Sequence, residues 1–220
     1  LDRGPFGVQQ YPNEIRMDQL EEELSLVGFW CRPLTLFDTF DPLNLKTLEH
    51  LDVLDAASDA TPVNFGFSTT ASPDEIKVRG YFNSAGGNVE QVAVAFLPAD
   101  VTAKFTMTGG RFRIGRALLL LNGDGTHPTG SGFAAARNRR LERTGLQIAA
   151  DTYELNADRL QNLRRHGINS RLLERTHAAT DSLLELARES LSSRRYERYS
   201  DLTNRARSYA SRTYSGVQGL

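Results

Sequence analysis

Apolar and polar residues alternate along the middle of this chain. The alternation is clear over 63–67, 76–82 and 101–107, and a period of two is typical of a strand that buries one face. Turns rich in glycine, proline and asparagine separate these stretches. Apolar runs at 92–97 and 113–121 add further candidate strands. We therefore predict a set of short strands in an antiparallel sheet, most simply a small β-sandwich of immunoglobulin-like size.

The apolar period changes to three and four residues after Ser131, which predicts amphipathic helices. Ser131 is a candidate N-cap for a first helix near 132–166, and Gly167 follows the basic last turn of that helix. Asn169 or Ser170 can cap the next helix in the same way. Both ends of the predicted first helix, at Ser131 and Gly167, therefore carry the expected signals.

Two more helices are predicted near 170–192 and 195–214, divided by Ser192 and Ser193. Because the connections are short, successive helices should lie antiparallel to each other. The C-terminal part is therefore predicted to be a helical hairpin or a three-helix bundle.

The first 59 residues have a mixed pattern. An acidic stretch that becomes apolar at 20–30 predicts a strand. Cys31 follows Phe29 and Trp30, and these neighbours indicate a buried thiol rather than a reactive one.

A short helix is predicted after this strand. Asp41 and Pro42 are residue types expected at an N-cap and at the first helical position. Leu45, Leu48 and Leu51 then recur at a spacing close to the helical period.

Composition supports a folded protein, because 40% of the residues are apolar and 24% are charged. Charge is unevenly distributed. Residues 1–130 contain 10 Lys+Arg and 17 Asp+Glu, whereas residues 131–220 contain 16 and 10, so the formal charges are −7 and +6. We predict an α+β chain with a mixed segment at 1–59, a β-sandwich domain at 60–125 and a helical bundle domain at 131–220.

No motif specifies a catalytic, cofactor or metal site. Asn122 to Thr126 places oxygen ligands at alternating positions, as a calcium loop does, but Phe133 stands where the loop needs a bidentate acid. A turn between sheet and helix explains the glycines of this segment without a metal. The four histidines, His50, His127, His166 and His177, lack the spacing of paired ligands and are better explained as helix-end or surface residues. We predict no catalytic residue, no metal and no cofactor.

Two alternatives stay open. One is a carbohydrate- or peptide-binding β-sandwich, for which Tyr81 is the obvious outward aromatic residue. The other is an enzyme with a carboxylate site around Asp38, Asp41 and His50, which requires these residues to lie within direct or water-bridged reach.

Arginines and tyrosines alternate near the start of the predicted third helix, a mixture common at protein interfaces. Another interpretation is that the tyrosines pack inward and the arginines are solvated. We predict an interaction surface made of Arg194, Arg195, Tyr196, Arg198, Tyr199 and Arg205.

Residues 127–220 also resemble a known class of protein. The stretch HPTGSGFAAARNRRLERTGLQIAADTYELNADRLQNLRRHGINSRLLE and the ending SRTYSGVQGL are similar to the helical segment of uncharacterised bacterial membrane proteins loosely related to FtsX-like permease proteins. In that family a β-rich extracytoplasmic part leads into such helices and then into a transmembrane region. The printed chain reaches Leu220 without an apolar run of membrane-spanning length, which puts anchoring and any transport role in question.

These observations favour a non-catalytic structural or interaction module of a membrane-associated assembly, docking through its β-domain and its basic helical bundle. We expect protein partners and no nucleic acid, because the basic part also contains ten carboxylates. Membrane contact is expected to be indirect or through a segment absent from the printed chain. The resemblance implies a periplasmic or other extracytoplasmic location.

Overall fold

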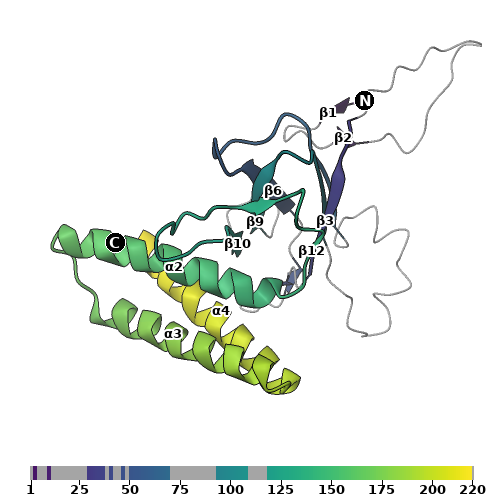
Figure 1. Ribbon diagram of the computed structural model, residues 1–220. Helices are drawn as coiled ribbons and strands as arrows, with labels where there is room; N and C mark the ends of the chain where they lie inside the picture. The colour runs from purple at the N-terminus through teal and green to yellow at the C-terminus, as the bar shows by residue number, and fades with distance from the viewer. Residues whose placement is uncertain are drawn as a thin grey trace, which may run out of the picture.

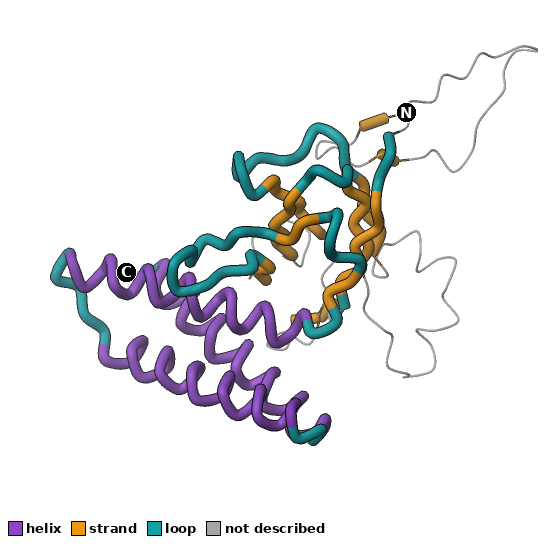
Figure 2. Tube along the Cα trace, viewed as in Figure 1, coloured by secondary structure: helices purple, strands orange, loops and turns teal. Residues whose placement is uncertain are grey.

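The protein combines small β-sheets with three C-terminal helices, as the computed structural model shows (Figures 1 and 2). The structure describes residues 2–3, 9–10, 29–37, 40–41, 46–47, 50–69, 93–108 and 118–219. The fold is therefore mixed α+β, as the periodicity predicts.

One sheet has the strand order β12-β3-β8-β7. These strands span Arg140–Leu141, Arg32–Leu36, Ala93–Leu97 and Gly66–Thr69. The short β12 runs parallel to β3, and the other two pairs are antiparallel.

A second sheet is centred on β9, which spans Thr102–Thr108. β6 (His50–Asp55) pairs with β9 along one edge, and β10 (Leu118–Leu120) and β11 (Phe133–Ala134) share the other edge. All three pairs are antiparallel. Two further pairs are β1 (Asp2–Arg3) with β2 (Gln9–Gln10) and β4 (Phe40–Asp41) with β5 (Lys46–Thr47).

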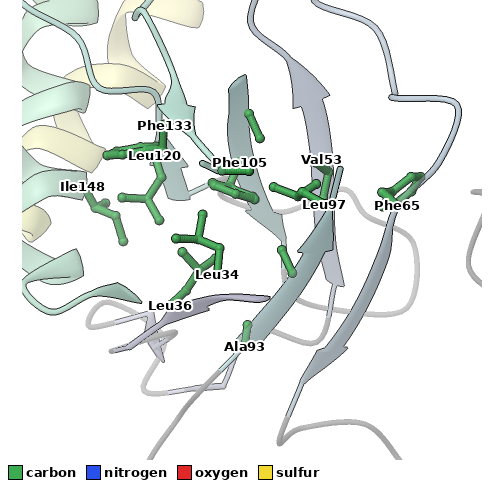
Figure 3. Close-up of a cluster of buried hydrophobic side chains, with 13 residues drawn as sticks. Leu34, Leu36, Val53, Phe65, Ala93, Leu97, Phe105, Leu120, Phe133 and Ile148 are labelled. Atoms are coloured by element: carbon green, nitrogen blue, oxygen red, sulfur yellow. The ribbon is translucent and has the colours of Figure 1, made fainter. Parts of the chain in front are cut away.

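Both larger sheets contribute to one apolar core (Figure 3). Alternate residues of β3 and β8 are buried, as period two requires, and Phe105 of β9 stacks near Phe133 of β11 with ring centroids 6.3 Å apart. Ile148 comes from the first helix and closes the core beside Leu120 and Phe133. The helical part is thus attached to the sheets through shared buried side chains.

Three helices follow, α2 (Thr144–Arg165), α3 (Arg171–Ser192) and α4 (Tyr196–Gln218). α2 begins beside the sheets and runs away from them, α3 returns, and α4 crosses against both (Figure 1). Small residues line the packed surfaces, with Ala149, Ala187 and Ala206 in the shared cluster, so the helices approach closely. The predicted bundle therefore has three helices.

The predicted start of the first helix is wrong. Ser131 caps no helix, because α2 begins at Thr144, whereas Phe133 lies in β11 and Leu141 in β12. Gly130 and Gly132 have φ values of +82° and +75°, which break the chain direction before β11. Pairing with β9 and β3 then outweighs the helix propensity of the alanine-rich stretch 134–136.

The helix predicted after Asp41 is also wrong where the structure describes it. Asp41 lies in β4 and Leu51 in β6, while Pro42, Leu45 and Leu48 lie outside the described residues. Short apolar patterns do not separate strands from helices, and pairing of β6 with the long β9 decides the outcome here.

Cys31 is exposed, which corrects the prediction of a buried thiol. Trp30 beside it is 98% exposed. Both residues precede β3, whose first buried side chain is that of Leu34, so they lie beyond the core. The strand predicted at 20–30 does not include Phe29 or Trp30, and its residues 20–28 lie outside the described part.

Candidate interaction surface

The turn between α3 and α4 places the first predicted surface residues. Arg195 donates its backbone N–H to Ser190 at 2.8 Å, and Arg194 donates to Leu191 at 3.0 Å. This is the hydrogen-bond pattern of a Schellman turn. Arg194 occupies the left-handed position with φ +56°, where glycine is the usual residue. An arginine there holds backbone strain at an exposed position.

Three of the remaining predicted residues project outward from α4. Tyr196 is 62% exposed, and Arg198 and Arg205 are exposed. Arg205 lies 3.8 Å from Asp201, a solvated pair that adds little stability. Tyr199 differs, because it is half-buried and packs against the apolar cluster between the helices. The structure thus brings Arg194 to Arg198 together at one end of the bundle and turns Tyr199 partly inward.

Arg205 belongs to a longer row of basic side chains. Arg198, Arg205 and Arg212 are spaced by seven residues, which places them on one face of a helix with 3.6 residues per turn. All three are exposed. The sequence prediction omitted Arg212, although the same spacing would have identified it. The exposed arginines therefore continue along α4 beyond the predicted residues.

A cluster of titratable residues on α2 and α3 was also missed. The Tyr153 and His177 rings stack with centroids 4.2 Å apart and planes 6° apart. Burial raises the pKa of Tyr153, and the Asp181 carboxylate raises it further. Burial lowers the pKa of His177, with Asp181 acting in the opposite direction. His177 and Asp181 are four residues apart on α3, a spacing visible in the sequence.

Glu154 adjoins this cluster. Burial raises the pKa of its carboxyl group, and the charge of Asp124 adds to the effect. Perturbed carboxyl and imidazole groups of this kind are suited to proton exchange when a substrate can reach them. Within the described residues, no three His, Cys, Asp or Glu side chains gather in a way that could hold a metal ion.

The segment with the calcium-loop resemblance is held by its own hydrogen bonds. Asp124 Oδ1 accepts the backbone N–H groups of Thr126 and His127 and the Thr126 hydroxyl, at 2.6–2.8 Å. These bonds hold the pKa of the Asp124 carboxyl at about 2. The segment thus forms polar turns, and a turn is the explanation of its glycines that needs no metal.

The remaining candidates are the histidines and the residues of the two alternatives, and several of them lie outside the described residues. His127 is exposed and His166 ends α2, as expected of surface and helix-end histidines, whereas His177 is half-buried. For the carboxylate-site alternative, Asp38 lies outside the described residues, and only the backbone of Asp41 and His50 is described. Tyr81, needed by the binding-sandwich alternative, is also outside them.

Comparisons of the chain with protein-family models, curated proteins and solved structures give no match. Among the helices described here, none has both the length and the apolar character required to cross a bilayer.

Proposed function

We propose that this chain is a non-catalytic structural and interaction module of a membrane-associated, extracytoplasmic assembly, and that α4 docks on an acidic protein partner. The observation that carries the proposal is the row of Arg198, Arg205 and Arg212 on one exposed helix face. Guanidinium groups form paired hydrogen bonds with carboxylates, so a regular row recognises a complementary acidic surface.

Backbone strain at Arg194, in the turn that precedes the row, supports the same role. Arg194 keeps a left-handed backbone that glycine would adopt without cost, and strained residues tend to persist at functional sites. Tyr196 adds an exposed aromatic side chain next to it, and aromatic residues with arginine are enriched at protein interfaces.

The β-part is proposed to be a small antiparallel sandwich of immunoglobulin-like size that carries the bundle. Its support is the single core shared by strands of both larger sheets. The membrane-associated, extracytoplasmic placement rests on the resemblance of residues 127–220 to the bacterial membrane proteins described above.

Site-specific photocrosslinking tests the docking role. A photoreactive residue replaces the exposed Asp201, which lies between Arg198 and Arg205, and the full chain is irradiated in its own cells. We expect a discrete protein adduct that disappears when Arg198, Arg205 and Arg212 are changed to Glu. A matched control reverses the exposed Arg137, Arg139 and Arg140 near β12 and should keep the adduct. An absent adduct, or one that survives reversal of the row, would refute the proposal.

A further inference from the structure

The turn between α2 and α3 lies at the end of the bundle away from the sheets (Figure 1). Two apolar side chains are exposed at this turn. Ile168 is 39% exposed and Leu172 is 74% exposed. Leu173, the next residue, faces the bundle instead, because its side chain contacts Gly216 at the end of α4. Residues 164–175 are called the hairpin tip below.

Basic residues flank these apolar residues in the sequence. The hairpin tip contains Arg164, Arg165, Arg171 and Arg175, and Glu174 is its one acidic residue. Arg164 pairs with Glu174 at 2.9 Å, which leaves a formal excess of three positive charges on the tip. α4 packs at this end, and it has no acidic residue after Asp201. The tip therefore carries a net positive charge.

The tip has a defined shape. Ile168 donates its N–H to Leu163 at 2.9 Å and Gly167 donates to Arg164 at 3.0 Å, with Gly167 at φ +78°. These bonds complete a Schellman motif, and Ser170 caps α3 by accepting from the Leu173 N–H. Both helix ends are thus satisfied, and the exposure of Ile168 and Leu172 is a property of an ordered turn.

We propose that the hairpin tip binds the surface of an anionic membrane, with Ile168 and Leu172 inserted between headgroups and the arginines against lipid phosphates. The tip lies at one end of the bundle (Figure 1) and carries a net positive charge, so a surface of uniform negative charge complements it. Basic residues beside a membrane and apolar side chains at the headgroup boundary strengthen such binding together. The inference goes beyond protein docking by α4 and uses different residues.

Vesicle co-sedimentation of the full chain tests this inference. We expect binding to vesicles of phosphatidylcholine with about one third phosphatidylglycerol, weak binding to phosphatidylcholine alone, and release at high salt. Changing Ile168 and Leu172 to Ser should weaken binding about tenfold or more. Changing Arg165, Arg171 and Arg175 to Gln should weaken it about fivefold per charge.

The matched control changes the exposed Arg137, Arg139 and Arg140 to Gln, which removes the same charge from a basic segment in and beside β12. This variant should keep most of the binding, and circular dichroism should show every variant folded.

Binding that is absent, or that survives both tip variants, would overturn the inference. If only the arginine variant loses vesicle binding, the tip adsorbs by charge alone, and the proposed insertion of Ile168 and Leu172 is overturned. A lipid-free protein complex that depends on Leu172 would assign the tip to a protein instead. Crosslinking on α4 is read separately, so the two proposals can fail independently.

Discussion

The carboxylate of Asp151 accepts the backbone N–H of Leu121 at 2.6 Å and thereby fastens α2 to the end of β10. The same side chain accepts the N–H groups of Asn122 at 3.0 Å and Gly123 at 2.8 Å, and the Gln147 amide at 2.9 Å. Asp151 is fully buried. Burial raises the pKa of this carboxyl group, and the four hydrogen bonds act against that effect. It is a structural carboxylate that joins the helical and β parts.

Asp151→Ala should lower the free energy of unfolding by roughly 3 kcal/mol, because it leaves buried backbone donors without an acceptor. Asp151→Asn should lower the free energy of unfolding by roughly 2 kcal/mol, since the NH₂ of the new amide must face one of the backbone N–H donors. Chemical denaturation measures both. Asp158→Asn, a partly exposed site on the same helix, is the control and should change stability by less than about 0.5 kcal/mol. Equal effects at Asp151 and Asp158 would show that the buried carboxylate does not hold the junction.

The sequence predicts those features that local signals determine. Gly167 and the two candidate caps, of which Ser170 is the one used, mark the α2–α3 connection correctly, because capping depends on a few neighbouring residues. The start of α2 is missed because β11 and β12 form only by pairing with β9 and β3, which are distant in sequence. Asp151 has no sequence signal, because a carboxylate within an amphipathic helix ordinarily indicates a solvated face.

At the candidate surface, too, local spacing is predictable from the sequence, whereas packing between helices is not. Arginines at 198 and 205 are correctly expected to be exposed, and regular spacing extends them to Arg212. The inward packing of Tyr199 depends on the crossing of α3 and α4, which periodicity does not specify. The stack of Tyr153 on His177 likewise depends on how α2 meets α3.

Gly130→Ala should destabilise the protein by roughly 3 kcal/mol. A Cβ at this position would overlap the Leu121 carbonyl oxygen, and φ is +82°. Gly167→Ala is a matched control, because φ is +78° there and no atom lies within 4 Å of the added Cβ. Its cost should be about 1 kcal/mol, from the backbone conformation alone. Thermal denaturation of both variants measures the difference, and similar costs would contradict close packing at Gly130.

Arg194→Gly should stabilise the protein by about 0.5–1 kcal/mol, because relief of the left-handed strain exceeds the added entropy of the unfolded chain. Arg195→Gly removes the same charge at φ −89° and should bring no gain. Urea denaturation compares the two variants. If Arg194→Gly is no more stable than the wild-type chain, the arginine is not strained.

Asp124 should titrate near pH 2, below the ordinary value of 3.8, because backbone and hydroxyl donors stabilise its ionised form. Its contribution to stability is therefore present above pH 3.8 and is lost as the pH falls toward 2. NMR titration of the carboxyl carbon measures the midpoint. Thr126→Val removes one donor and should move the midpoint upward, whereas a midpoint near 3.8 in the wild-type chain would contradict the turn geometry.

His177 should make the helical bundle less stable in mild acid. Its folded-state pKa lies below the ordinary 6.5 because of burial, so the unfolded chain binds more protons just below that pH. The contribution is present above pH 6.5 and is lost as the pH falls through the folded-state pKa. Because the ring is partly exposed, we expect a loss of less than about 1 kcal/mol. Asp181, Arg164 and Tyr153 are the groups that face it.

His177→Phe isolates this contribution, because it keeps a ring against Tyr153 and removes the titrating group. Urea denaturation of both chains at several pH values between 5 and 8 compares them. The wild-type chain should lose more stability on acidification than the Phe variant, and all other carboxylates and histidines cancel in the difference. If the two chains lose stability in parallel, or the wild-type chain gains stability in acid, the His177 imidazole is not held in its neutral form by burial between α2 and α3.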